Sequence, residues 1–181
     1  TFNQGARTGC FSREELGADE EHFYTELIKK IYRSAVLGLG SIGEFHAREL
    51  HRGGTVVSAI LTRNQKKSEQ LVLELRKNYG IDAKPFSDFN HLLQTQELDI
   101  VSVCTPAECH YKHTIKCLEK GINVLCEKPL VNKGFDKQYL SACNLFNIAN
   151  KYDIKLSVNT QLVTILNYIP NFLFNKSVDF S

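Results

Sequence analysis

A regular alternation of short apolar runs with longer amphipathic segments constrains the fold more than any other feature of this chain. Short apolar runs stand at 34–39, 55–61, 99–105, 122–126 and 154–158, and the run 55–61 is also rich in β-branched residues. Strands that are buried on both faces have continuous apolar sequences, and repeated strand–helix units favour a parallel sheet with helices on both faces. We therefore predict an α/β fold built on a doubly wound parallel sheet.

The segments between these runs have the apolar spacing and the capping residues of helices. Helices are predicted over 19–31, 44–52, 64–80, 87–94, 106–121 and 133–153. A further short strand is predicted over 81–84. We expect Leu71 and Leu75 to face inward from their helix. The last helix is expected to bury a face made of Tyr139, Ala142, Cys143, Phe146 and Ala149.

Composition narrows the class of protein. The chain has 181 residues, which suffice for one domain and a fragment of another at roughly 100–200 residues per domain. A net charge of +2 provides no strongly basic surface for nucleic acid or for an anionic membrane. No apolar run approaches the ~20 residues of a membrane span, and the first residues of this sequence lack the apolar stretch expected of a secretory signal. We expect a cytoplasmic protein with a small-molecule substrate, and neither nucleic acid nor membrane as a partner.

The six cysteines do not suggest a metal site. They stand at positions 10, 104, 109, 117, 126 and 143, and no two have the C-x-x-C spacing typical of zinc ligands. Several lie in apolar runs, where a free cysteine packs as a small hydrophobic residue. We expect reduced thiols and no bound metal.

The first motif with a chemical meaning is GLGSIG, which has the spacing G-x-G-x-x-G at Gly38, Gly40 and Gly43. It follows a predicted strand and opens a predicted helix, as in the Rossmann dinucleotide-binding unit. There the first glycine permits a tight turn, the second lets a pyrophosphate approach the backbone, and the third lets helix and strand pack closely. Gly38, Gly40, Ser41, Ile42 and Gly43 are therefore predicted to bind the pyrophosphate; a ligand-free glycine turn is the alternative.

The second motif is Thr62-Arg63, about 20 residues beyond the glycines at the end of the next strand. A site selective for NAD carries Asp or Glu at this place to bind the ribose 2′-hydroxyl, whereas an arginine can pair with the 2′-phosphate of NADP. We favour NADP and keep NAD open. The alternative is that Arg63 stacks on the adenine or faces solvent.

Thr105 and Pro106 follow the strand predicted over 99–105. Ligands of doubly wound sheets bind outside the carboxyl ends of the strands, so both residues are predicted to line the cofactor cleft. His110, in the following helix, is included among the candidate cofactor-binding residues. His113 is interpreted as a surface or packing residue.

Glu127, Lys128 and Pro129 follow the strand predicted over 122–126 and so reach the same edge. A lysine there can hydrogen-bond a substrate hydroxyl or polarise a carbonyl during hydride transfer. Lys128 is the predicted catalytic residue, and Glu127 is predicted to orient it; both are also counted as cofactor-binding. Pro129 would fix the turn, with a cis peptide bond as one option. A salt-bridged surface loop is the alternative.

Together these motifs resemble the glucose-fructose oxidoreductase / inositol dehydrogenase / rhizopine-catabolism (Gfo/Idh/MocA) family. The stretch VLGLGSIGEFHARELH is similar to its first strand–helix unit, including His46 three residues after the last glycine. The stretch DIVSVCTPAECHYKHTIKCLEKGINVLCEKPL is similar to its Thr-Pro segment, two histidines and Glu-Lys-Pro motif. The resemblance covers about 33–160 and implies that Lys128 touches substrate near the nicotinamide.

The resemblance also implies a second α/β domain, which closes over the cofactor, mediates oligomers, and supplies an Asp and an acid/base His. We expect that domain to be largely absent from this chain. The predicted organisation is an N-terminal extension with one helix (1–32), a Rossmann domain (33–158) and the start of the second domain (159–181). The segment 159–181 lacks the arginine that the family usually carries after the sixth strand. A partner chain or a homo-oligomer could supply the missing part.

The leading functional hypothesis is an NAD(P)-dependent oxidoreductase. It would transfer hydride between NADP and a secondary alcohol of a sugar, polyol or related small molecule. One alternative is a regulatory protein of the same fold that senses the nucleotide without turnover, and another is a truncated product without function.

Overall fold

The computed structural model describes residues 31–132 and 135–160. The sheet and its helices lie in a compact unit that begins at Tyr32. The helix predicted over 19–31 and the domain start predicted over 159–181 fall almost wholly outside the described residues. The proposed division of the chain into three parts therefore stays a prediction.

Six parallel strands alternate with five helices along the described residues. The strands are β1 (Arg33–Leu37), β2 (Val56–Leu61), β3 (Lys84–Phe86), β4 (Ile100–Val103), β5 (Asn123–Glu127) and β6 (Leu156–Asn159). The helices are α3 (Ser41–Arg52), α4 (Gln65–Tyr79), α5 (Phe89–Thr95), α6 (Ala107–Glu119) and α7 (Phe135–Lys151). None of these helices is long and apolar enough to cross a membrane.

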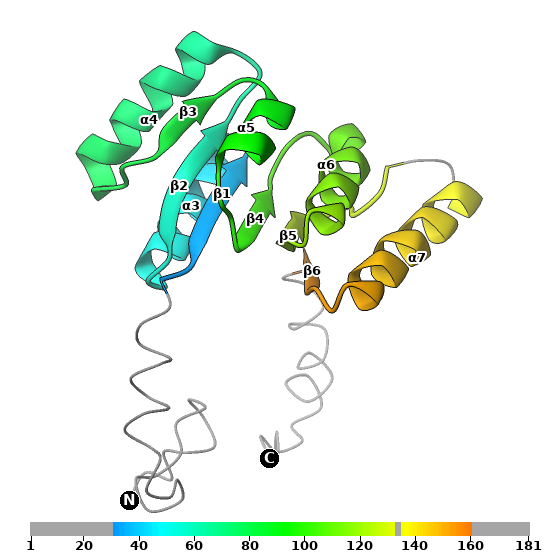
Figure 1. Cartoon of the computed structure of the whole chain (residues 1–181). Helices are drawn as coiled ribbons and strands as arrows, with labels where there is room; N and C mark the ends of the chain where they lie inside the picture. The colour runs from blue at the N-terminus through cyan, green and yellow to red at the C-terminus, as the bar shows by residue number, and fades with distance from the viewer. Residues whose placement is uncertain (1–30, 133–134, 161–181) are drawn as a thin grey trace, which may run out of the picture. The chain divides into compact units, whose positions relative to one another are not determined.

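The order of strands in the sheet is β3-β2-β1-β4-β5-β6 (Figure 1). The chain starts at the centre, moves outward through β2 to β3, returns to place β4 beside β1, and then moves outward the other way. The direction of winding therefore reverses between β1 and β4. In open α/β sheets such a switch point is where the crevice for a ligand forms.

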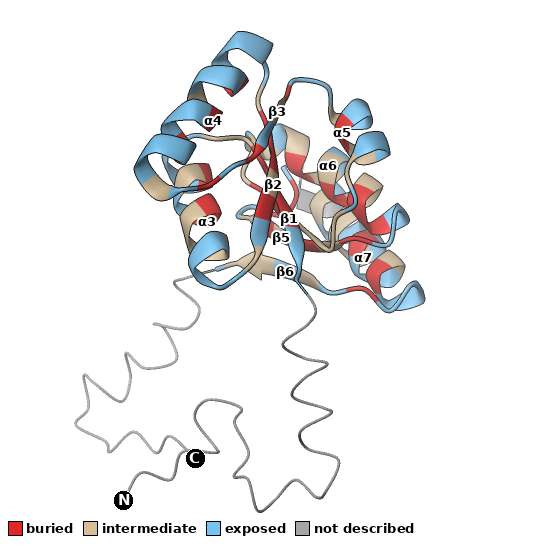
Figure 2. Ribbon diagram, turned by 60° about the vertical axis from the view of Figure 1, so that its left-hand side comes forward, coloured by how far each residue is buried: buried red, intermediate tan, exposed pale blue. Residues whose placement is uncertain are grey.

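Helices cover both faces of the sheet, with α3 and α4 on one face and α5, α6 and α7 on the other (Figure 2). β1 shows how the two cores arise from one strand. Val36 packs with residues of α3 and α4, whereas Ala35 and Leu37 pack in the core on the opposite face. All three are fully buried. The predicted doubly wound parallel sheet is confirmed.

The third strand differs from the prediction. The structure places β3 at Lys84–Phe86, whereas the sequence predicted 81–84. Ile81 and Ala83 are buried in the core that includes Leu75 of α4, so their apolar character reflects packing of a loop. Pro85 is accommodated in the strand because β3 lies at the edge of the sheet, where a missing donor is tolerated.

The buried face of α7 was also predicted wrongly in part. Ala149 is buried as expected, but Tyr139 and Phe146 are exposed. Leu145, which is fully buried, takes the central place in the packing against the sheet. In α4, Leu75 is buried as predicted, and the residue buried beside it is Val72, while Leu71 is only half-buried.

Candidate functional site

The residues predicted to form a site follow the carboxyl ends of four different strands. Gly38 comes directly after β1, Thr62 after β2, Thr105 two residues after β4, and Lys128 after β5. Because all the strands are parallel, these ends lie at the same edge of the sheet. The structure therefore brings the predicted segments together around the switch point between β1 and β4.

Two glycines of the GLGSIG loop are required by the protein's own packing. Gly38 has a φ of +88°, and a Cβ built on it would lie 2.6 Å from the Cys104 carbonyl oxygen. A Cβ on Gly43 would lie 1.9 Å from the carbonyl oxygen of Gly38. Side chains at these positions would push α3 away from β1 and β4. These two glycines therefore explain how α3 approaches the sheet so closely.

Gly40 has no such reason within the described protein. Its φ of −86° is open to any residue, and a Cβ built on it meets no heavy atom within 4 Å. The space beside its backbone is thus open. A glycine at the start of α3 leaves that space available for a ligand that must come close to the main chain.

The N-terminus of α3 can bind an anion in that space. α3 begins at Ser41, and Gly40 provides no side chain to cap the helix. The first N–H groups of an α-helix have no acceptor within the helix, and together with the helix dipole they favour a phosphate. Ile42 and Ser41 both lie in this exposed first turn. The arrangement suits the pyrophosphate of a dinucleotide.

Thr62 and Arg63 follow β2, next to the glycine loop. The Thr62 hydroxyl donates to the carbonyl oxygen of Asn64, 2.9 Å away, which fixes the turn before α4. Arg63 is exposed, and its guanidinium forms no hydrogen bond or ion pair with a described residue. A guanidinium without a partner beside an anion site is available to a phosphate group.

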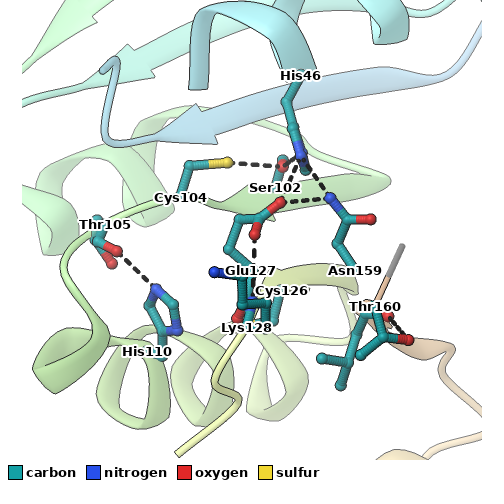
Figure 3. Close-up of polar contacts among 11 residues, drawn as sticks. His46, Ser102, Cys104, Thr105, His110, Cys126, Glu127, Lys128, Asn159 and Thr160 are labelled. Atoms are coloured by element: carbon teal, nitrogen blue, oxygen red, sulfur yellow. Dashed lines mark hydrogen bonds and ion pairs between the residues drawn. The ribbon is translucent and has the colours of Figure 1, made fainter. Parts of the chain in front are cut away.

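The segment after β4 is tied to the turn after β5 by His110, which is buried in α6. Its Nε2 lies 2.6 Å from the Thr105 carbonyl oxygen, and its Nδ1 lies 2.7 Å from the Pro129 carbonyl oxygen. Figure 3 shows the ring between the two segments. His110 therefore fixes Thr105 and Pro106 relative to Lys128, and a contact between His110 and the cofactor stays a prediction.

His113 is half-buried one turn further along α6. Its Nδ1 lies 3.1 Å from the Thr105 hydroxyl, and its ring packs edge-on against Phe89 with 4.6 Å between ring centroids. Burial lowers the pKa of His113 to about 4, and the nearby charge of Lys112 acts in the same direction. The side chain thus packs inside the molecule next to the candidate site.

Lys128 stands at the end of β5 with its side chain exposed. Its ammonium forms no hydrogen bond or ion pair with a described residue. The peptide bond between Lys128 and Pro129 is cis. The Glu127 carboxylate does not contact the ammonium; its Oε2 accepts from the Lys128 backbone N–H at 3.3 Å. Glu127 therefore holds the backbone of Lys128 rather than its side-chain charge.

The other oxygen of Glu127 belongs to a polar cluster on the sheet face that α3 covers (Figure 3). Glu127 Oε1 lies 2.9 Å from His46 Nε2 and accepts a short hydrogen bond from the Asn159 amide. His46 Nδ1 lies 2.7 Å from the Ser102 hydroxyl. His46 and Ser102 are buried, so the cluster is largely removed from water.

Cys104 adds a last member to this cluster. Its Sγ lies 3.4 Å from the Ser102 hydroxyl, within reach of a weak hydrogen bond. Burial raises the pKa of the Cys104 thiol to about 11. At neutral pH the thiol keeps its hydrogen and does not act as a nucleophile. Among the described residues no group of three metal-ligating side chains comes together.

Sequence reasoning missed Ser102 and Asn159. Both are polar residues in apolar strands, and that is the signal that could have found them. Ser102 alternates with Val101 and Val103, which face the other core, so it points towards α3. Asn159 is the register partner of Glu127 across β5 and β6. Strand register, which sequence alone did not provide, brings these two side chains together.

A six-stranded parallel sheet with a glycine-rich loop at its switch point defines the class of dinucleotide-binding Rossmann domains. The profile of the Gfo/Idh/MocA family, described as an oxidoreductase family with an NAD-binding Rossmann fold, matches residues 32–160. The chain belongs to this family.

Characterised relatives share only part of their length with this chain. Myo-inositol 2-dehydrogenase of Thermotoga maritima is 33% identical over 98 residues, which are 54% of this chain and 28% of the relative. Glucose-6-phosphate 3-dehydrogenase of Bacillus subtilis is 28% identical over an alignment of 175 positions, which covers 83% of this chain and 44% of the relative. The chain thus spans less than half the length of either enzyme.

Solved structures of the family have the same fold. A variant of a 3-ketoreductase from Actinomadura kijaniata, solved in complex with TDP-benzene and NADP, superposes with a TM-score of 0.60 at 26% identity. The superposition covers 72% of this chain and 37% of that chain.

Proposed function

We propose that this chain binds a nicotinamide dinucleotide at the carboxyl edge of the sheet, NADP in preference to NAD, and that Lys128 acts on the substrate of a hydride transfer. The proposed substrate is a sugar, a polyol or a related small molecule with a secondary alcohol. The observation that carries the proposal is the open space beside Gly40 at the N-terminus of α3. Packing within the protein accounts for glycine at positions 38 and 43, whereas a ligand close to the backbone would account for glycine at position 40.

The proposed place of the cofactor follows from the elements around that space. The N–H groups of Ser41, Ile42 and Gly43 would hold the pyrophosphate. Arg63, which is exposed and has no partner among the described residues, would pair with the 2′-phosphate on the β2 side of the loop. Thr105 and Pro106, on the β4 side, would line the nicotinamide half, since they stand between the glycine loop and Lys128 in the strand order.

The bound nicotinamide would supply the chemistry of hydride transfer. In the direction of oxidation, the substrate carbon loses a hydride and its hydroxyl loses a proton. The Lys128 ammonium, which has no partner in the described part of the chain, would donate a hydrogen bond to that oxygen and orient it. The group that takes the proton is expected in the second domain, as the family resemblance implies.

The names of the relatives support the substrate class. They are dehydrogenases of myo-inositol and of glucose 6-phosphate, which are small polyhydroxylated molecules. The resemblance does not distinguish one polyol from another, because this chain spans less than half the length of either relative.

The experiment that tests the cofactor is a calorimetric titration of the 181-residue chain with NADPH and with NADH. We expect NADPH to bind more tightly. Arg63→Ala should weaken NADPH binding about 10- to 100-fold, as expected for the loss of a charge-assisted contact, and leave NADH nearly unchanged. Lys77→Ala, which removes an exposed charge at the far end of α4, is the matched control.

The outcomes separate the alternatives. An equal loss of NADPH and NADH affinity in Arg63→Ala would contradict a role in binding the 2′-phosphate. Binding of NADPH without turnover of any polyol by the full-length protein would favour a regulatory protein that senses the nucleotide. Turnover that is abolished by Lys128→Met, with NADPH binding retained, is the result that the proposal requires.

A further inference from the structure

The carboxylate of Glu127 connects elements that carry the two halves of the proposed site. His46 reaches it from α3, the helix of the glycine loop, and Asn159 reaches it from the end of β6. On its other side the same carboxylate accepts the backbone N–H of Lys128. One carboxylate group therefore contacts α3, which carries the proposed phosphate site, as well as β6 and the proposed catalytic lysine.

The hydrogen bonds from Cys104 to Glu127 can form a chain that runs from donor to acceptor. The Asn159 amide nitrogen also lies 3.2 Å from His46 Nε2, and in this arrangement its hydrogen bond goes to Glu127 Oε1. An ionised carboxylate only accepts, so a hydrogen bond to Glu127 requires the hydrogen of the His46 ring to be on Nε2. His46 Nδ1 can then accept from the Ser102 hydroxyl at 2.7 Å. Ser102 in turn can accept from the Cys104 thiol at 3.4 Å. The raised pKa of Cys104 is consistent with that thiol keeping its hydrogen.

A change in this cluster would move the Glu127 carboxylate and, with it, the backbone of Lys128. The side chains of His46 and Glu127 are only 4% and 14% exposed, so water can replace little of what they provide. Removing one partner would leave a buried charge or a buried donor without its hydrogen bond, which is costly. The Ser102 hydroxyl is fully buried, so the Ser102–His46–Glu127 sequence has no access to a substrate and cannot act as a nucleophilic triad.

We propose that His46 and Asn159 are positioning residues: they hold the Glu127 carboxylate, and through it the backbone of Lys128, in register with α3. The proposal rests on the proposed function for its effect on turnover, since that effect requires Lys128 to touch the substrate. Its structural part, the control of the Lys128 backbone by the two side chains, can be measured without any ligand.

The test exchanges the hydrogen-bond donor, the Asn159 amide, with the acceptor, the Glu127 carboxylate. Asn159→Asp places two carboxylates side by side, and Glu127→Gln removes the carboxylate that His46 and Asn159 share. The double variant Glu127→Gln/Asn159→Asp restores a carboxylate–amide pair of the same shape and net charge, with the roles reversed. Asn78→Asp, the same change on the exposed side of α4, is the matched control.

The first readout is hydrogen exchange of the Lys128 amide, measured by NMR in the ligand-free protein. Each single variant should raise the exchange rate of this amide about tenfold or more, while the amide of Leu75 in α4 keeps its rate, and the double variant should recover most of the loss. Equal acceleration at both amides, or no change at Lys128, would overturn the proposal. A long-range nitrogen–proton spectrum should show the His46 hydrogen on Nε2 in the wild type.

The second readout separates positioning from a purely structural role. In the Asn159→Asp variant we expect kcat of the full-length protein to fall about 10- to 100-fold, as for a reacting group moved by about 1 Å, with the Kd for NADPH changed by less than about twofold. Unchanged kcat would overturn the positioning role. If the wild type binds neither dinucleotide, the proposed function fails, and the amide and tautomer measurements still decide whether the network holds Lys128.

Discussion

At the scale of single residues, the three glycines of the GLGSIG loop meet different physical requirements. Gly38 is needed for a backbone conformation and Gly43 for close packing of α3 against the turn. Gly40 is needed for neither. Only the second of the three glycines is therefore left for the proposed ligand to explain.

This difference leads to a prediction for Gly43→Ala and Gly40→Ala. A methyl group at position 43 would meet the Gly38 carbonyl oxygen, so Gly43→Ala should lower the free energy of unfolding by about 1–3 kcal/mol. Gly40→Ala should cost less than about 1 kcal/mol, because only the helix start is affected. Urea unfolding measures both.

The affinity for NADPH provides a second test of the role of Gly40. Gly40→Ala, although stable, should bind NADPH at least about tenfold more weakly, because its methyl group occupies the space proposed for the pyrophosphate. Unchanged affinity in a folded Gly40→Ala protein would contradict the assignment of the phosphate site.

At the scale of elements, local sequence accounts for where the helices begin and end. The Asn64 side chain accepts from the Lys67 backbone N–H at the start of α4, and Gly80 closes that helix in the left-handed conformation. Asp88 caps α5 by accepting from the His91 N–H, and this hydrogen bond lowers the pKa of the Asp88 carboxyl group. The partners in these caps are only three to five residues apart, so local sequence is enough to predict them.

The packing of α5 against α6 leads to a pH dependence. Burial, with the charges of Lys112, His110 and Lys116, lowers the pKa of His113 from 6.5 to about 4. Between these values the unfolded chain binds a proton that the folded protein does not. Stability is therefore fully present above pH 6.5 and decreases as the pH falls towards 4.

His113→Gln should make stability less dependent on pH within this window, since the side chain no longer titrates. The measurement is the urea midpoint of both proteins at pH 7, 5.5 and 4.5. The expected difference in slope is modest, because the half-buried ring is partly screened by solvent. Parallel curves for the two proteins would show that His113 is not the group responsible.

At the scale of the whole molecule, the two helical layers remove most of the central strands from water. Cys117 in α6 and Cys126 in β5 are fully buried on the same face of the sheet. Burial raises the pKa of Cys117 to about 12 and that of Cys126 to about 11. Neither thiol is poised to react in the native protein.

Alkylation by iodoacetamide at pH 8, followed by mass spectrometry of the peptides, tests this layering. Cys117 and Cys126 should react at least about 100-fold more slowly in the native protein than in urea, as expected for thiols that lack both exposure and the thiolate form. Cys109 and Cys143, which are half-buried, should be modified before Cys117 and Cys126. Rapid native labelling of Cys117 would mean that α6 separates readily from the sheet.

The sheet order explains why residues far apart in the chain form one candidate site. The glycine loop, Arg63, Thr105 and Lys128 come from four strand–helix units, and the winding of the chain brings their strands to one edge. This arrangement was predictable from the sequence, because parallel strands that are buried on both faces place all their carboxyl ends together.

Sequence by itself determined the fold class, the places of the strands other than β3, and the segments that carry the candidate site. These follow from local patterns: continuous apolar runs, helix caps and glycine spacing. The short edge strand β3 was predicted at the wrong place. Ile81 and Ala83 are apolar because they pack in the core from a loop, and the sequence alone does not distinguish such a loop from a strand. The buried face of α7 was partly misassigned, because adjacent apolar stripes on one helix satisfy the same period.

Only the tertiary structure decided which polar groups meet. The register of β5 and β6 places Asn159 beside Glu127, and the approach of α3 brings His46 between Glu127 and Ser102. His110 likewise faces two carbonyl oxygens that are separated from it in the chain. Hydrogen bonds need positions accurate to a few tenths of an ångström, and such positions are set by the packing of whole elements rather than by neighbours in sequence.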